Sequence, residues 1–199
     1  ALGFNEYLSK KNYQHDDFAG WGGAALSDLS FFRQSVDKLK DSQPFYSFMV
    51  TLSTHHPFNY FQDRNFKLGE WEATFMGNYL NAMNYLDYCI GELIDKLNAE
   101  GMYSNSVIVI YGDHFGIPRY MTEQLSQINN VADTKIEIMK LQKVPLIIIC
   151  PAIEADVIET VGGEVDIMPT IANLMNFKAP YALGNDLTQT KEGYPAFRN

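Results

Sequence analysis

An apolar run that ends in an acid and a histidine constrains the fold of this chain more than any other feature. Residues 106–111 are rich in valine and isoleucine, and Gly112, Asp113 and His114 follow at once. A run of this kind is typical of a buried strand, and the glycine predicts a loop at its carboxyl end. In open α/β sheets, ligands and metals gather at that end of the strands. The motif therefore predicts an α/β fold with a candidate site at Asp113 and His114.

Further periodic segments extend the prediction. Residues 45–52 and 144–150 each predict a strand, and residues 78–99 carry apolar side chains at the three- and four-residue spacing of a long helix. Gly101 suits the turn that ends this helix. The order of strand 45–52, helix and strand 106–111 predicts a βαβ unit, and such a unit implies parallel pairing of its strands.

Two shorter helices are predicted from capping residues. Ser27 or Asp28 caps a helix that runs to Leu39, because serine and aspartate accept hydrogen bonds from the first turn. Asp166 precedes an apolar segment with Pro169 in its first turn. We interpret Asp166 as a helix cap rather than as a metal ligand.

Composition limits the function. The chain has 199 residues, of which 46% are hydrophobic and 20% charged, so we expect one globular domain. Its net charge of -9 argues against a nucleic-acid binder, which needs a basic surface. No apolar stretch is long enough to span a bilayer. The first residues resemble the middle of a domain, so we expect residues 1–199 to be a single partial domain.

Histidines follow both strands of the predicted βαβ unit. His55 and His56 come after residues 45–52, and His114 comes after residues 106–111. Carboxyl ends of parallel strands share one edge of a sheet, where these side chains could bind a metal and an anion together. Carboxylate and imidazole both suit a divalent ion such as Zn²⁺ or Mn²⁺. The residues alone leave a second interpretation open, in which Asp113 caps a turn and the histidines are polar loop residues.

Several ordered motifs resemble the lipoteichoic acid synthase family, the sulfatase-like phosphoglycerol transferases of the alkaline phosphatase superfamily. The resemblance runs from about Phe45 to the end of the chain. It rests on residues 51–58, the helix that includes residues 85–87, residues 106–116, 144–147 and 163–170, and the terminal Phe197, Arg198 and Asn199.

The resemblance implies a doubly wound, mainly parallel α/β sheet with helices on both faces, incomplete here at its N-terminal side. It implies that Asp113 and His114 hold Mn²⁺, or another divalent metal such as Mg²⁺, Zn²⁺ or Ca²⁺. It also implies that His55 contacts the substrate phosphate, with His56 in a position often taken by an aromatic residue. The family's threonine nucleophile comes from an earlier segment, so no catalytic nucleophile is identified in this chain and we expect the chain alone to be inactive.

The implied function is phosphoglycerol transfer from a phosphatidylglycerol-type lipid to a cell-envelope polymer or glycan. The family is usually tethered by N-terminal transmembrane helices at the extracellular or periplasmic face of the membrane. Two alternatives stay open. One is a sulfatase or a phosphoethanolamine transferase on the same fold, although Phe115 directly after His114 favours the phosphoglycerol branch. The other is a catalytically inert module that binds a glycan or a protein.

Overall fold

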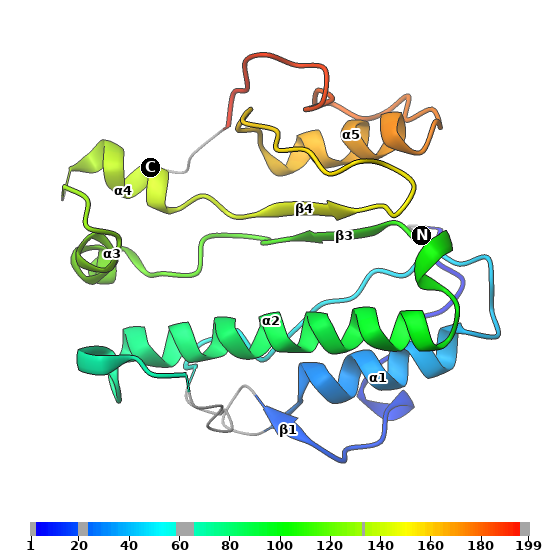
Figure 1. Cartoon of the computed structure of the whole chain (residues 1–199), viewed down its shortest axis with the longest axis horizontal. Helices are drawn as coiled ribbons and strands as arrows, with labels where there is room; N and C mark the ends of the chain where they lie inside the picture. Colours follow the sequence, from blue (N-terminus) through cyan, green and yellow to red (C-terminus); the bar gives the residue numbers. More distant parts are fainter. Residues whose placement is uncertain (1–2, 20–23, 59–65, 133, 196–199) are drawn as a thin grey trace. The chain divides into compact units, whose positions relative to one another are not determined.

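The computed structural model describes residues 3–19, 24–58, 66–132 and 134–195, and Figure 1 shows its elements along the chain. The motif at residues 197–199 lies outside these ranges. The chain divides into two compact units. The first comprises Ala1–Ile108, Gly116–Lys143 and Ile148–Pro151, and the second comprises Val109–Phe115, Val144–Ile147 and Ala152–Asn199. The single partial domain over residues 1–199 stays a prediction.

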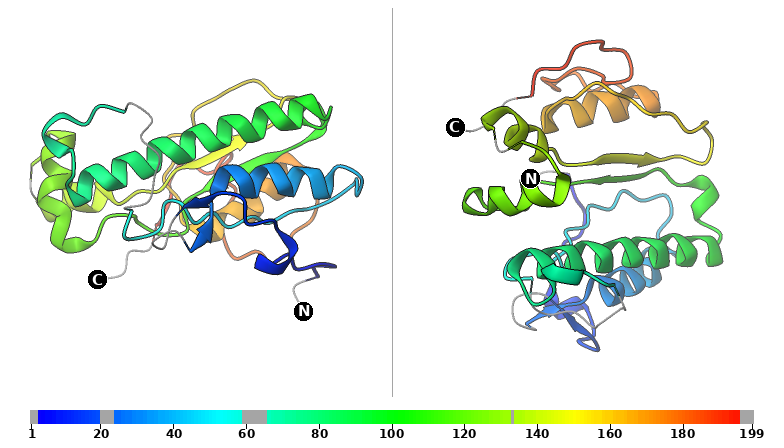
Figure 2. Two further views of the ribbon diagram at one scale, coloured as in Figure 1. Left: turned by 90° about the horizontal axis from the view of Figure 1, so that it is seen from below. Right: turned by 60° about the vertical axis from the view of Figure 1, so that its left-hand side comes forward.

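Two helices that run in the same direction form the centre of the first unit. Helix α1 spans Asp28–Leu39 and α2 spans Phe75–Ala99, and they lie side by side in every view (Figures 1 and 2). Both predicted helices are confirmed. Helix α2 begins three residues before the predicted start, at residue 75 rather than 78, because the Thr74 hydroxyl accepts a 2.9 Å hydrogen bond from the Gly77 amide. Gly101 follows the helix with a left-handed φ of +69°.

The α1–α2 pair buries two small apolar clusters. The residues are Phe32, Tyr85 and Cys89 in the first cluster and Val36, Leu97 and Met102 in the second. Full burial of such a side chain is worth about 1.5–3 kcal/mol. Burial also raises the pKa of Tyr85. The ion pair between Lys96 Nζ and Asp37 Oδ1, at 2.7 Å, joins the two helices at the surface.

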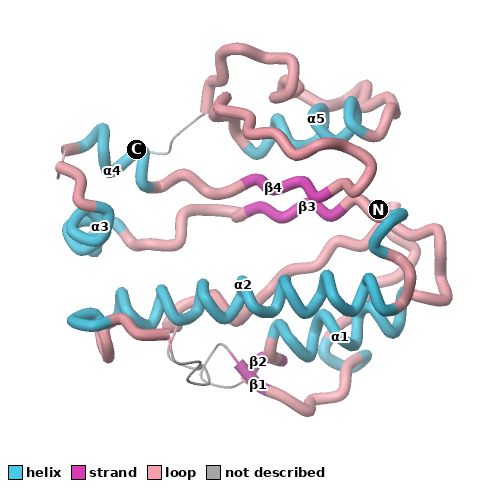
Figure 3. The backbone as a smooth tube through the Cα atoms, viewed as in Figure 1, coloured by secondary structure: helices cyan, strands magenta, loops and turns pink. Residues whose placement is uncertain are grey.

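The strand predicted over residues 45–52 is not formed. No strand is assigned there, and within the described residues the paired strands are β1 with β2 and β3 with β4 (Figure 3). Exposure nevertheless alternates along the segment. Met49 packs against the first apolar cluster, whereas Phe48 and Val50 are 55% and 61% exposed. The period of two is that of a strand, but a strand also needs a hydrogen-bonded neighbour, and the described chain provides none.

The remaining elements of the first unit are short. Strands β1 (Phe18–Ala19) and β2 (Ala25–Leu26) pair antiparallel, and β2 leads directly into α1. Helices α3 (Thr122–Asn129) and α4 (Lys135–Leu141) follow one another and pack together. The 3-10 turns are η1 (Lys10–Asn12), η3 (Gly69–Trp71), η4 (Tyr103–Asn105), η5 (Arg119–Met121) and η6 (Glu164–Asp166), the last in the second unit.

Strands β3 (Ile108–Tyr111) and β4 (Leu146–Ile149) confirm the predicted strands over 106–111 and 144–150. The Gly112 amide, just after β3, donates to the Pro145 carbonyl, just before β4, at 3.3 Å. A bond from the end of one strand to the start of the other makes this pair antiparallel (Figure 1). The parallel partner predicted for residues 106–111, residues 45–52, is not paired with it.

Helix α5 (Ile167–Leu174) completes the second unit and confirms the helix predicted after Asp166. Across the described ranges, no helix combines the length and the apolar character that crossing a bilayer requires.

Candidate functional site

His55 lies in a tight turn of the first unit. Its amide donates to the Leu52 carbonyl at 3.0 Å, and its own carbonyl accepts from the Phe58 amide at 3.2 Å. The ring Nδ1 lies 2.8 Å from the His56 carbonyl, which can only accept, so Nδ1 carries the proton. In the neutral ring Nε2 then carries the lone pair. The backbone thus sets both the position of His55 and its tautomer.

His56 has a different environment although it is the next residue. Its ring centroid lies 5.8 Å from that of Phe58 and 5.6 Å from that of Phe75. Phe58 itself is buried and meets Phe75 and Tyr79 edge to face, each at 5.3 Å. His56 therefore packs as an aromatic residue. The assignment of the phosphate contact to His55 stays a prediction.

Asp28, one of the two residues predicted to cap helix α1, instead binds the backbone of the His55 turn. The Leu52 amide donates to Asp28 Oδ1 at 2.9 Å, and the Ser53 amide donates to Oδ2 at 3.2 Å. In return the Asp28 amide donates to Ser53 Oγ at 3.1 Å. Asp28 is 1% exposed and Ser53 is 0% exposed. The signal in the sequence was an acidic residue close to apolar residues on both sides, since a carboxyl group that is buried needs hydrogen-bond partners.

Burial sets the protonation behaviour of Asp28. It raises the pKa of this carboxyl group above the ordinary value, and the hydrogen bonds from Leu52 and Ser53 offset the shift only in part. The helix cap itself is Ser27, whose hydroxyl accepts from the Ser30 amide at 3.1 Å.

Asp113 and His114 lie in the second unit, directly after β3. Their side chains are 78% and 70% exposed, and His114 Nε2 lies 3.7 Å from Asp113 Oδ1. His114 Nδ1 lies 2.7 Å from the Phe115 carbonyl and so donates its proton there. This leaves the lone pair of the neutral ring on Nε2, the atom that points to the carboxylate. A backbone acceptor on the far nitrogen is a common way to orient a metal-binding histidine.

The donor set fits a divalent metal but does not complete a coordination shell. One carboxylate oxygen and one imidazole nitrogen are suitable ligands. Among the described residues, however, no group of three or more histidine, cysteine, aspartate or glutamate side chains could hold an ion together. His55 belongs to the first unit and this pair to the second. The meeting of the two loops therefore stays a prediction, and the pair of parallel strands on which it was based is not formed within the described residues.

Asp166 occupies the cap position of α5, as predicted, but its side chain does not cap the helix. Oδ2 accepts from the Gly163 amide at 2.8 Å, and Oδ1 accepts from the Asn185 amide at 2.7 Å. The Thr170 hydroxyl donates to the Asp166 carbonyl at 2.7 Å. Asp166 thus fastens two loops of the second unit instead of capping α5 with its side chain.

A pocket in the first unit holds none of the predicted site residues. It is lined by Glu70, Trp71, Thr74, Gln127 and Ile128. The site predicted from sequence is carried instead by exposed loops.

Comparisons with known proteins place the chain in a family. The model of the sulfatase family, described as "Sulfatase", matches residues 1–177. Lipoteichoic acid synthase 1 of Bacillus subtilis is 32% identical over 100% of this chain and 32% of its own length. Lipoteichoic acid synthase of Staphylococcus saprophyticus is 32% identical over 81% of this chain and 26% of its own length. The chain thus matches about a quarter to a third of the length of these curated relatives.

Solved structures agree with the sequence comparison. The lipoteichoic acid synthase LtaP from Listeria monocytogenes matches with a TM-score of 0.79 and 31% identity, over 93% of this chain and 47% of that one. A protein of the alkaline phosphatase superfamily from Vibrio parahaemolyticus matches with a TM-score of 0.70 at 23% identity, over 94% and 43%. These matches confirm the predicted alkaline phosphatase-like α/β fold, of which this chain is a part. The chain belongs to the sulfatase family, and within it the chain resembles the lipoteichoic acid synthases.

Proposed function

We propose that this chain is part of a metal-dependent phosphoglycerol transferase that acts on a phosphatidylglycerol-type lipid. The product would build or decorate a cell-envelope polymer or glycan. The observation that carries the proposal is similarity to lipoteichoic acid synthases along the whole chain, together with an Asp113–His114 pair suited to a divalent ion. We also propose that the protein acts at the outer face of the cell membrane and is anchored by helices outside this chain, as the similarity to lipoteichoic acid synthases suggests.

Each proposed residue has a distinct role. Asp113 and His114 would hold Mn²⁺ or a similar ion, which supplies positive charge to phosphate oxygens and activates a coordinated hydroxyl. His55, with its proton on Nδ1, presents the unprotonated Nε2 of the neutral ring. Protonated at Nε2, it would stabilise charge on the phosphate or protonate a leaving oxygen. Phosphoryl transfer depends mostly on such positioning and charge.

The decisive experiment compares donors. The chain, extended upstream as its gene encodes it, is assayed with Mn²⁺ on a fluorescent phosphatidylglycerol and on an aryl sulfate. We expect transfer of glycerol phosphate, lost in Asp113→Asn. Turnover of the sulfate ester alone would replace the proposal with a sulfatase, the second candidate, which the name of the matching family model favours.

We further propose that the 199-residue chain is inactive by itself. In this proposal Asp113, His114 and His55 contact the metal and the phosphate, and no residue of the chain is assigned as the nucleophile. A covalent mechanism without its nucleophile keeps only residual activity. A chromogenic phosphodiester with Mn²⁺ provides the assay. Equal turnover by the chain and by the extended protein would contradict this proposal.

A further inference from the structure

The buried carboxyl group of Asp28 is linked to His55 by two consecutive hydrogen bonds. We propose that Asp28 is a positioning residue that fixes the His55 turn against helix α1. The proposal rests on the proposed role of His55 as a phosphate contact and extends it to a residue that touches no substrate.

The link runs through the backbone of Leu52. Asp28 Oδ1 accepts from the Leu52 amide at 2.9 Å, and the Leu52 carbonyl accepts from the His55 amide at 3.0 Å. The neighbouring Ser53 forms two hydrogen bonds with Asp28. The Ser53 amide donates to Asp28 Oδ2 at 3.2 Å, and the Ser53 Oγ accepts from the Asp28 amide at 3.1 Å. A shift of the Asp28 carboxyl group would therefore move the base of the His55 turn.

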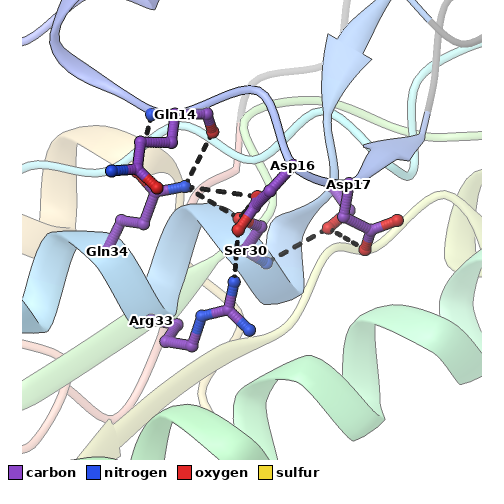
Figure 4. A network of polar contacts seen from close by, with 7 residues as sticks. Gln14, Asp16, Asp17, Ser30, Arg33 and Gln34 are labelled. Carbon is purple, nitrogen blue, oxygen red and sulfur yellow. Dashed lines mark hydrogen bonds and ion pairs between the residues drawn. The ribbon is translucent and has the colours of Figure 1, made fainter.

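The helix end that carries Asp28 is itself anchored. The Ser27 amide donates to the Asp17 carbonyl at 3.0 Å, and the Ser27 hydroxyl donates to Asp17 Oδ2 at 2.6 Å. Further along α1, the Ser30 hydroxyl and Arg33 Nη2 both donate to the carboxylate of Asp16, the latter at 2.6 Å (Figure 4). The carboxyl group thus projects from a fixed support, as a positioning group must.

An aspartate suits this place better than an asparagine. Two carboxyl oxygens accept from two amides, whereas an amide side chain offers one acceptor and would bring its own N–H groups towards the donors of Leu52 and Ser53. The first turn of a helix also favours negative charge. Asp28→Asn therefore loosens the turn while it preserves side-chain size.

Hydrogen exchange of the chain tests the link without any assay of activity. In Asp28→Asn we expect the Leu52 and Ser53 amides to exchange about tenfold faster or more, because a hydrogen bond to a charged group is lost. The matched control is Asp166→Asn, which removes the same kind of bond from the Gly163 and Asn185 amides. It should speed exchange there and leave Leu52 and Ser53 as in the wild type. Unchanged exchange of Leu52 and Ser53 in Asp28→Asn would overturn the proposal.

Kinetics of the extended protein test whether Asp28 acts through His55. Asp28→Asn should lower kcat about 10- to 100-fold, the scale of a small misplacement of a reacting group. In a His55→Ala background the same substitution should cause no further loss. Equal losses in both backgrounds would mean a general structural role and would overturn the proposal.

Ser53→Ala keeps the experiment decisive if Asp28→Asn does not fold. It removes the side-chain bonds of Ser53 to Asp28 but keeps the backbone bonds of Leu52 and Ser53 to the carboxyl group, so its loss of kcat should be smaller but should again vanish with His55→Ala. Wild-type turnover in His55→Ala alone would instead refute the proposed function of His55. The exchange result would still report, separately, whether Asp28 holds the turn.

Discussion

The two loops that carry the predicted site residues are held in different ways. In the first unit, the His55 turn is tied by backbone amides to the carboxyl group of Asp28, which is 1% exposed. In the second unit, Asp113 and His114 are 78% and 70% exposed and lie 3.7 Å apart, and the Phe115 carbonyl orients only the far side of the imidazole.

The difference shows which geometry the chain builds by itself. The His55 turn is organised by hydrogen bonds to a group that has no water to compete for them, so its order is independent of any ligand. The Asp113–His114 pair has suitable donors but few contacts of its own. A pair of this kind takes its final geometry when an ion binds. The role of His55 should therefore be sensitive to substitutions that change the packing around its turn. The role of Asp113 and His114 should be sensitive to substitutions that remove their metal-binding atoms.

The largest effect is expected at Asp113. In the extended protein, Asp113→Asn should weaken Mn²⁺ binding by more than about 100-fold, since loss of a group that merely supports a ligand already costs about 10- to 100-fold. Isothermal calorimetry measures it, with Asp156→Asn, an equal change of charge at an exposed site of the same unit, as the control. Equal Mn²⁺ affinity in Asp113→Asn and the wild type would remove Asp113 from the metal site.

Substitution of the two adjacent histidines should separate their roles. His55→Ala should lower turnover of the phosphoglycerol donor by about 100-fold, typical of lost acid–base or charge stabilisation. His56→Phe should cost little, because the ring contacts with Phe58 and Phe75 are kept. Steady-state kinetics decide the order, and a larger loss in His56→Phe would mean that the assignment of the phosphate contact is reversed.

The folding stability of the chain should depend more on the His55 turn than on the Asp113 loop. Asp28→Ala should lower the free energy of unfolding by about 2 kcal/mol, because the Leu52 and Ser53 amides stay buried without an acceptor. Asp113→Ala, at an exposed position, should change it by no more than about 0.5 kcal/mol. Urea unfolding of both variants provides the comparison. Similar losses would show that the Asp113 loop is as firmly built as the His55 turn.

The smallest effect is expected in the pH dependence of stability. Burial raises the pKa of Asp28 above 3.8, so its ionisation disfavours the folded state, and wild-type stability relative to Asp28→Asn should fall as pH rises through the raised value. Asp16 should behave in the opposite way. The Ser30 hydrogen bond lowers the pKa of Asp16, with Arg33 assisting, so its stabilising contribution is lost as pH falls below 3.8.

Unfolding curves from about pH 3 to pH 7 test both signs. The Asp16→Asn variant serves as the reference for an exposed carboxylate. A parallel pH dependence for Asp28→Asn and Asp16→Asn would contradict the contrast between a carboxyl group dominated by burial and one dominated by hydrogen bonding.

Local patterns in the sequence were enough to predict most elements. Apolar spacing gave helix α2 to within three residues at its start, Ser27 was one of two candidates for the cap of α1, and Gly101 was expected after α2. These features depend on residues a few positions apart. The motifs around His55 and Asp113–His114 also indicated the family that the comparisons confirm.

The partner of a strand and the bonds of a buried acid are not local properties. Residues 45–52 have the alternation of a strand, yet pairing depends on a neighbour elsewhere, and the described chain leaves them unpaired. Residues 106–111 pair instead with a strand nearly forty positions later, in the antiparallel sense. Periodicity predicts which face of a segment is buried, but it carries no information about which segment lies beside it.

The sequence by itself determined helices α1, α2 and α5 and strands β3 and β4, and it indicated the family. Only the tertiary structure decided that Asp28, 24 and 25 positions before Leu52 and Ser53, fastens the turn that bears His55. It likewise decided that Asp166 binds the Asn185 amide, 19 positions away, rather than its own helix. The physical reason is that a buried carboxyl group must find hydrogen-bond donors, and folding alone determines which backbone amides are brought within its reach.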